Sequence, residues 1–331
     1  MRKLVYIALL CLLGINTQGQ DPQYTQFYAT STYLNPAFAG TSIQHRLGAA
    51  YRNQWPGIPG SFKSYAFSYD RYAPYINSGF GFLATNDYAG AGALGNTTLA
   101  AQYAYEARIT RSWFFRPALQ FSYTNRSIDF DGLFFTDQQI RNNDPTSLEE
   151  NTGNPVNYFD VGAGFLVMNK QLWLGAAVHH LTEPQESIYG DVNARIPRKI
   201  GVHGGYRFKF ENQFARQKSS LVAAFSYKQQ GDFNQLDLGA YYEINPIVMG
   251  IWYRGLPAKS NGYGRANHDA MTVLVGWYDG PYKVGYSYDI TISQLGIGQS
   301  GGSHEITITY EWANRRNKKL AKRRIIPCAK F

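Results

Sequence analysis

The chain is poor in cysteine, which excludes one common way of stabilising an exported protein. Its 331 residues include two cysteines, Cys11 and Cys328. Cys11 lies in an N-terminal apolar run that export would remove, so no intrachain disulfide can form in the remaining chain. An exported protein without disulfides must be stabilised by its size, its packing or its insertion into a membrane.

Long hydrophobic runs are lacking too. The N-terminal apolar run follows Arg2 and Lys3, extends over residues 4–15 and gives way to small and polar residues at 17–20. A membrane-spanning helix needs about 20 apolar residues, so this run is too short to be one. A positive start, a short apolar centre and a small-residue end are typical of a secretory signal peptide. We predict that residues 1–20 direct Sec-dependent export and are then removed.

Acidic residues are missing from the C-terminal end. The net charge is +9, of which the predicted signal peptide supplies two and residues 314–331 supply eight; subtracting both leaves −1 for residues 21–313. This neutral body argues against a nucleic-acid-binding domain. The tail is either a solvated end or a periplasmic contact for an acidic partner or anionic lipid headgroups, and the sequence leaves both open. The candidate partner-binding cations are Arg315, Arg316, Lys318, Lys319, Lys322, Arg323 and Arg324.

What the body does contain is alternation of apolar and polar residues with a period of two, which predicts β-strands. Between residues 64 and 70 one face carries Tyr65, Phe67 and Tyr69, and the other carries Ser64, Ala66, Ser68 and Asp70. The pattern recurs over residues 99–106, 159–167, 236–242, 282–289 and 305–312.

Two features separate these strands from those of a soluble sandwich. The aromatic face carries no charge, as contact with lipid requires, because a charge at the middle of a bilayer costs about 2–4 kcal/mol. The segments run for roughly 9 to 12 residues, the length with which a tilted strand crosses a bilayer. Strands of soluble proteins are usually nearer five or six residues. We therefore predict an all-β fold, a transmembrane antiparallel β-barrel of a bacterial outer membrane.

About fourteen strands are expected, an even number as in bacterial barrels. They span 44–54, 62–71, 78–87, 95–106, 112–125, 157–168, 171–181, 197–208, 218–229, 234–243, 246–254, 268–278, 282–291 and 303–313. Short connections alternate with long ones, of which 126–156 is the longest. Because such barrels keep their short turns in the periplasm, both chain termini are expected there. The expected domains are a signal peptide (1–20), a periplasmic or plug segment (21–43), the barrel (44–313) and a basic periplasmic tail (314–331).

Motifs that would carry chemistry are weak. Residues 90–95 match the spacing of a dinucleotide-binding loop, but the residues that follow alternate as a strand and do not form a helix. His179 and His180, with Glu183 and Glu186 nearby, could suggest a metal site, but adjacent residues of a strand point to opposite faces. No local signature of a catalytic nucleophile is present. We expect no catalytic, cofactor or metal site and no small-molecule substrate.

Charged residues on the small, polar face are the remaining candidates for chemistry. They could form a catalytic cluster, but ion pairs that line a barrel lumen are the favoured interpretation. These residues are Asp70, Asp160, Asp237, Asp289 and Glu311, with Arg46, Arg52 and Lys283.

Several segments resemble the PorP/SprF family of type IX secretion outer-membrane proteins. They are QDPQYTQFY (20–28), YLNPAFAG (33–40), YRNQWP (51–56), ND (86–87), RSIDF (126–130), AVHHLTEP (177–184), PRK (197–199) and RRIIPC (323–328). The resemblance implies an integral outer-membrane barrel, without enzymatic activity, that supports secretion or surface attachment of exported proteins such as adhesins or gliding-motility proteins. The implied partners are type IX components, one exported cargo protein and outer-membrane lipid.

Two other functions stay open at this point. A diffusion channel or hydrophobic-solute transporter would have the same architecture, and an outer-membrane hydrolase would need a nucleophile cluster that the sequence does not reveal. In the secretion hypothesis, the segment 126–156 would face the cargo and the basic tail would face periplasmic machinery.

Overall fold

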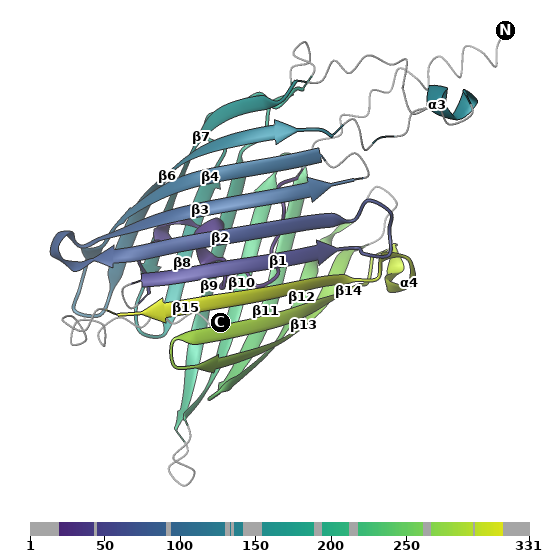
Figure 1. Ribbon diagram of the computed structural model, residues 1–331. Coiled ribbons are helices and arrows are strands. Elements are labelled where there is room, and N and C mark those ends of the chain that lie inside the picture. Colours follow the sequence, from purple (N-terminus) through teal and green to yellow (C-terminus); the bar gives the residue numbers. More distant parts are fainter. Residues whose placement is uncertain are drawn as a thin grey trace.

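One antiparallel sheet closes on itself to form a barrel (Figure 1). The structure, a computed structural model, describes residues 20–42, 45–90, 94–129, 133, 136–141, 154–188, 194–211, 218–260, 266–293 and 295–313. Each strand pairs with its neighbours in sequence, and β1 pairs with β15, which closes the barrel. The two-residue β5 follows β4 directly and pairs with the same strand, β6, so fourteen long strands make up the wall.

The long strands are β1 (His45–Gln54), β2 (Phe62–Ala73), β3 (Ser78–Ala89), β4 (Leu94–Tyr105), β6 (Phe114–Ser127), β7 (Val156–Met168), β8 (Leu172–His179), β9 (Lys199–Glu211), β10 (Lys218–Gln230), β11 (Phe233–Ile244), β12 (Ile247–Ser260), β13 (Ala266–Asp279), β14 (Tyr282–Thr291) and β15 (Ser303–Trp312), with β5 at Ala107–Arg108. The short helices are α2 (Ser31–Leu34), η1 (Pro36–Phe38), η2 (Pro74–Ile76), α3 (Thr136–Ile140) and α4 (Gly296–Ser300). Among the described residues, no helix has both the length and the apolar character needed to cross a membrane.

All fourteen predicted strands are present, and most of their ends differ from the prediction by one to three residues. Two differences are informative. β12 continues beyond residue 254 to Ser260, because its pairing with β13 resumes after a register shift at Arg254/Gly255. β8 stops at His179, before the predicted end at residue 181, because His180 adopts a φ of 58° and leaves the strand.

The predicted division into two faces is confirmed. On β2, Tyr65 and Phe67 point outward and are exposed, while Ser68 and Asp70 point inward and are buried. The same holds on β15, where Ile306 and Ile308 are exposed and the alternating residues Glu305, Thr307 and Thr309 are buried. The outer surface is therefore an aromatic and aliphatic belt, and the interior is lined by small, polar and charged side chains. This is the distribution that lipid outside and polar groups inside require.

The two ends of the barrel differ. We call the end where β1 begins and β15 ends the terminal end, and the opposite end the loop end (Figure 1). Tight connections such as 245–246 and 280–281 lie at the terminal end. The long connections 128–155 and 180–198 lie at the loop end.

Candidate functional site

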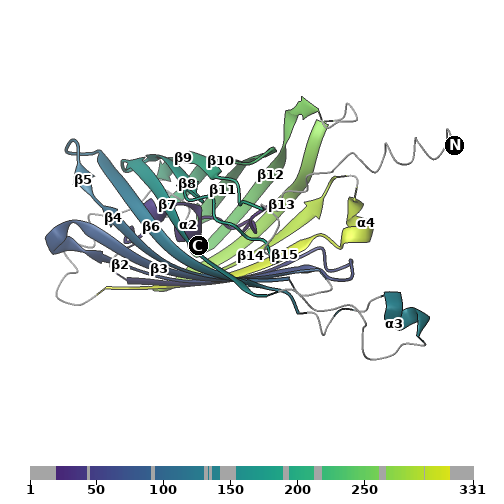
Figure 2. The same ribbon diagram turned by 90° about the horizontal axis from the view of Figure 1, so that it is seen from above.

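Residues 21–42, called the plug segment below, lie inside the barrel. Figure 2 shows α2 of this segment within the ring of strands. Every side chain from Tyr24 to Ser42 except that of Tyr33 is buried. The segment runs from the loop-end half of the lumen, at Asp21, to the terminal end, where the chain enters β1.

The turns of the plug segment follow from its sequence. Asn35 ends α2 and its side chain accepts a hydrogen bond from the backbone N–H of Ala37 at 2.9 Å, which caps η1, while Pro36 supplies the fixed φ that suits a helix start. Gly40 has a φ of 70°, and a Cβ there would lie 2.6 Å from the Cα of Gly79 on β3. Glycine is therefore required at both positions, because the two backbones are in contact.

At the terminal end, wall side chains bind the backbone of the plug segment. The guanidinium of Arg116 on β6 donates to the carbonyl oxygens of Ala37 at 3.1 Å and Ala39 at 2.5 Å. Arg116 also forms an ion pair with Glu106 at 2.5 Å, and both are buried. In the opposite direction, the side chain of Asn35 in the plug segment donates to the backbone carbonyl oxygen of Phe165 on β7 at 3.0 Å. Hydrogen bonds to buried backbone carbonyls fix the path of the chain, since those groups would otherwise be unsatisfied.

In the middle of the lumen, aromatic rings hold the plug segment. Phe27 packs edge-on against Trp252 of β12 with ring centroids 4.8 Å apart, and Tyr28 packs against Trp173 of β8 and Tyr241 of β11, both at 5.7 Å. These rings belong to the main buried cluster of the barrel. An apolar core inside the lumen departs from a purely polar interior, and it stabilises the plug segment because each buried aromatic ring removes a large apolar area from water.

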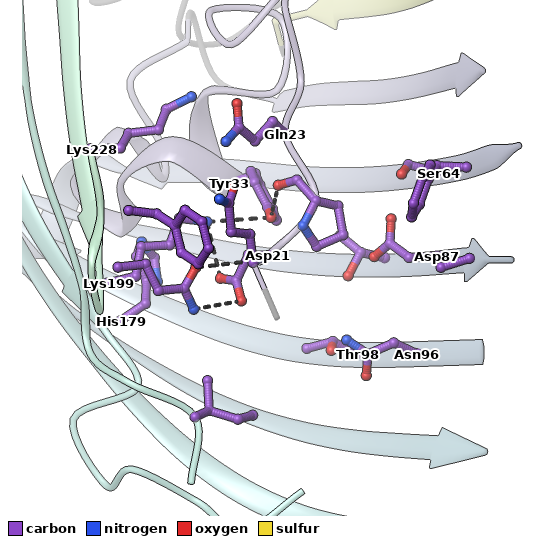
Figure 3. Close-up of a pocket in the computed structure, with 18 of the residues that line it drawn as sticks. Asp21, Gln23, Tyr33, Ser64, Asp87, Asn96, Thr98, His179, Lys199 and Lys228 are labelled. Carbon is purple, nitrogen blue, oxygen red and sulfur yellow. Dashed lines mark hydrogen bonds and ion pairs between the residues drawn. The ribbon is translucent and has the colours of Figure 1, made fainter. Parts of the chain in front are cut away.

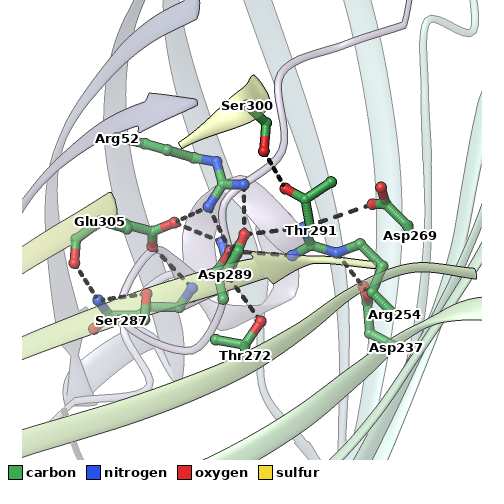
Figure 4. A network of polar contacts seen from close by, with 12 residues as sticks. Arg52, Asp237, Arg254, Asp269, Thr272, Ser287, Asp289, Thr291, Ser300 and Glu305 are labelled. Carbon is green, nitrogen blue, oxygen red and sulfur yellow. Dashed lines mark hydrogen bonds and ion pairs between the residues drawn. The ribbon is translucent and has the colours of Figure 1, made fainter. Parts of the chain in front are cut away.

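A network of charges binds the plug segment to the wall formed by β1, β12, β14 and β15 (Figure 4). Arg52 forms ion pairs with Asp289 at 2.7 Å and Glu305 at 3.2 Å, and Arg254 forms one with Asp289 at 3.1 Å. The hydroxyl of Thr25 donates to Asp289 at 2.8 Å and accepts from both arginines. Glu305 also accepts from the backbone N–H of Thr25 at 2.6 Å. These ions are buried, and each has a partner of opposite charge, which lowers the cost of burying them.

At the loop-end side of the plug segment, Asp21 connects three wall residues. Its carboxylate lies 2.9 Å from Nε2 of His180, 3.0 Å from Nζ of Lys199 and 3.0 Å from Nε2 of Gln230. Burial alone would raise the pKa of Asp21, but the charges of Lys199 and His180 outweigh it and hold the pKa well below its usual range. The carboxylate is therefore ionised at neutral pH and joins the plug segment to β9, β10 and the end of β8.

A cavity of about 1110 Å³ lies at the loop end, between the start of the plug segment and the strand ends. Its two walls differ in chemistry (Figure 3). Lys199 and Lys228 of β9 and β10 lie on one side. Ser64, Asp87 and Asn96 of β2, β3 and β4 lie on the other. The cavity is therefore a cup that has the plug segment as its floor and carries cationic groups on one wall and neutral and acidic polar groups on the other.

The attachment of Asp21 to the barrel wall should depend on pH, because one of its partners, His180, is titratable. His180 lies just outside β8. Burial lowers the pKa of His180, but Asp21 and Asp160 outweigh burial and raise the pKa to about 9. A raised pKa in the folded state means that the stabilisation is complete below about pH 6.5, the ordinary value for histidine, and is lost as the pH rises through about 9. We expect a spin label at Gln23→Cys, in a Cys328→Ser background, to become more mobile between pH 7 and 10.

The matched control is His180→Gln, which keeps a hydrogen-bonding side chain but cannot carry the charge. In that variant the label should already be more mobile at pH 7 and should change little up to pH 10. Equal pH profiles in the two proteins would contradict the assignment to His180.

The predicted ion-pair network of the lumen is confirmed. Arg46 pairs with Asp70 at 2.6 Å, Arg52 with Asp289 at 2.7 Å and Lys283 with Glu311 at 2.7 Å. Asp160 and Asp237 pair with His180 and Arg254 at 3.0 and 3.1 Å. These charges bind one another and the plug segment, which is the arrangement of a structural network.

The expectation for the two adjacent histidines was wrong in its geometry. His179 and His180 both line the cavity, because His180 leaves the strand and no longer alternates with its neighbour. Within the described part of the chain, no group of three or more histidine, cysteine or acidic residues is placed to hold a metal ion.

Some predicted residues lie outside the described residues. These are the signal peptide up to residue 19, the seven tail cations from Arg315 to Arg324, and most of the segment between Arg126 and Val156. The sequence interpretation also missed Asp21, Thr25 and Arg254, which hold the plug segment. The available signal was weak: Thr25 is an ordinary polar residue, and its partner Asp289 is 264 positions away.

Taken together, the closed antiparallel wall, the apolar belt and the polar, occupied lumen define an outer-membrane β-barrel. The family model described as "Type IX secretion system membrane protein PorP/SprF" matches residues 16–310. The chain belongs to this family, which confirms the resemblance seen in its sequence motifs and places the protein with the type IX secretion system. A comparison with curated proteins finds no match.

Among solved structures, the chain is similar to other barrels at low identity. It matches the CymD monoaromatic hydrocarbon channel at 11% identity and a TM-score of 0.43, covering 86% of this chain and 93% of that one. It matches the P. putida toluene transporter TodX at 10% identity and a TM-score of 0.43, covering 85% of this chain and 93% of that one. CdiB from Acinetobacter baumannii matches at 6% identity and a TM-score of 0.45, covering 81% of this chain and 60% of that one. At such scores the similarities carry no inference about the function of this chain.

Proposed function

We propose that this protein is a non-enzymatic component of the type IX secretion system that holds or passes an exported protein at the cell surface. Membership of the PorP/SprF family supports the association with the type IX secretion system. The observation that carries the proposal is the division of the lumen: the plug segment fills the terminal-end part, and a cup of about 1110 Å³ remains at the loop end. Such a cup suits the reception of a polypeptide segment from the loop end.

The orientation that we propose follows from the connections. The tight turns lie at the terminal end and the long connections at the loop end, so the terminal end would face the periplasm and the cup would face outward. Residues 1–20 would act as the Sec signal peptide. The outward belt would contact outer-membrane lipid, and the exported partner, an adhesin or gliding-motility protein, would enter the cup.

The proposal is tested by purifying the tagged protein from gently solubilised outer membranes and identifying what accompanies it. A large exported protein or type IX components should co-purify. A partner-free barrel that conducts ions or takes up hydrophobic solutes in liposomes would contradict the proposal and would favour the channel function instead.

We also propose that the basic tail is a periplasmic docking element. Deletion of residues 315–331 should leave the amount of inserted barrel unchanged but abolish display of the exported partner, measured by surface labelling of that partner on intact cells. The control replaces the seven cations from Arg315 to Arg324 with glutamine, which keeps the length and should have the same effect if charge is what matters. Normal display in both variants would mean that the tail is only a solvated end.

A further inference from the structure

A row of polar residues crosses the inner wall of the cup on five neighbouring strands. In the register of the sheet, Arg52 lies opposite Ser64, Ser64 opposite Asp87, Asp87 opposite Asn96, and Asn96 opposite Arg126. Directly opposite residues of antiparallel strands place their side chains next to one another on the same face. The five side chains are therefore consecutive neighbours around the lumen.

The cations at both ends of this row have carboxylate partners, but the carboxylate in the middle has no cation. Arg52 pairs with Asp289 and Glu305, and Arg126 pairs with Glu186. No ion pair within the described residues includes Asp87. Asp87 receives a hydrogen bond from Ser64, yet its Oδ1 is buried and no donor in the described part of the chain reaches it. The Oδ1 of Asn96, its neighbour, is in the same situation.

Two buried acceptors without donors are costly, because each has lost its bonds to bulk water. The cations of the facing wall do not supply the missing donors: Lys199 is bound to Asp21 at 3.0 Å and Lys228 lies 3.4 Å from Asp237 (Figure 3). Most other charged residues that face the cavity are paired within the wall or with the plug segment, so Asp87, which has no ion-pair partner among the described residues, is the candidate for a functional position. Arg52 and Arg126 at the ends of the row each keep a buried Nε–H without an acceptor, but within the described residues neither donates to the Oδ1 of Asp87 or of Asn96. Both oxygens are therefore open to a positively charged donor from a group that enters the cup.

We infer that Asp87 and Asn96 form a recognition subsite for one lysine or arginine side chain of a polypeptide segment that enters the cup. The inference rests on the proposed function for the identity of that polypeptide. An ammonium or guanidinium group offers several N–H donors and a positive charge, which matches one carboxylate and one amide oxygen side by side. A metal ion is a poorer match, because the described residues provide no group of three or more metal-ligating side chains here.

The inference is tested with purified full-length protein in detergent and two fluorescent pentapeptides with blocked termini. Their sequences are Gly-Ser-Arg-Ser-Gly and the same peptide with citrulline, which has the shape of arginine without its charge. Anisotropy titrations should show that the arginine peptide binds about ten- to hundredfold more tightly than the citrulline peptide, as expected for hydrogen bonds to a charged group. The variant Asp87→Asn should lose this preference.

Matched controls separate the subsite from general electrostatics and from folding. Asp232→Asn removes the same charge from an exposed position that lines the same cavity, and it should keep the preference for arginine. Asn96→Ala keeps the carboxylate and should weaken binding roughly three- to tenfold. The heat-dependent gel shift of folded barrels reports insertion of each variant, and Asn96→Ala remains a test if Asp87→Asn does not fold.

Three binding results would overturn the inference. These are an undiminished arginine preference in folded Asp87→Asn, equal binding of the two peptides to the wild type, or ethylguanidinium binding as tightly as the arginine peptide, which would assign the subsite to small cations. Failure of the proposed function is distinguishable, since it would appear as absence of an exported partner from the wild-type preparation while the peptide preference persists. Conversely, an exported partner that co-purifies equally with the wild type and with Asp87→Asn would contradict the subsite but leave the proposed function intact.

Discussion

Deletion of residues 21–40 should convert the barrel from a closed into a conducting one. The plug segment fills the lumen at the terminal end, and the pairing of the wall strands does not include it. The wall should therefore still close, while the lumen gains a continuous water-filled path. Planar-bilayer recordings of the purified deletion variant should show stable conducting steps that the wild type lacks.

The same deletion should reduce stability by several kcal/mol. Phe27, Tyr28 and Phe38 are almost fully buried, and burial of each such ring stabilises by about 1.5–3 kcal/mol. The control is a variant that keeps the plug segment but carries Gln23→Ala, a half-buried position at the cavity, and this variant should stay closed. A correctly folded deletion variant without conductance would mean that other parts of the chain fill the lumen.

The second large effect is expected from Arg52→Met. Arg52 neutralises Asp289 and Glu305 and donates to Thr25 of the plug segment (Figure 4). Methionine has a similar length but no charge, so a buried carboxylate loses its partner. Breaking a buried ion pair from one side costs about 3–5 kcal/mol. The free energy of unfolding, measured by urea titration of protein refolded into liposomes, should fall by that amount.

An exposed ion pair of the same type provides the matched control. Arg198 pairs with Glu183 at 3.1 Å, but the two side chains are 55% and 38% exposed. Arg198→Met should therefore change the unfolding free energy by about 1 kcal/mol or less. The double variant Arg52→Met/Glu305→Gln should recover part of the loss, because one uncompensated charge disappears. Similar losses in Arg52→Met and Arg198→Met would contradict the buried network.

The strands could be predicted because the signal that specifies them is local. Alternation on β2, from Ser64 to Asp70, already assigns each side chain to one face, since the period of a strand is two residues. The inward charges could be predicted for the same reason, as could their pairing, because lumen charges without partners are costly. Predictions failed where a single residue leaves the pattern, as at His180 with its positive φ.

The contacts of the plug segment could not be predicted. Thr25 meets Asp289 and Arg254, and Asn35 meets the carbonyl oxygens of β7 and β8, across 130 to 264 positions of sequence. Polar residues such as these have no periodicity to indicate a partner. The position of Asp87 beside Asn96 could likewise be read only from the register of β3 against β4.

The sequence by itself determined the barrel, its two faces and, through its motifs, the family. These are consequences of strand periodicity and of the exclusion of charge from lipid, both of which act over a few neighbouring residues. Only the tertiary structure decided how the lumen is divided into a plug segment and a cup, and which carboxylate in that cup is left without a cation. Closure of the sheet brings strands from the two halves of the chain face to face, and which side chains then meet depends on the register of all of them together.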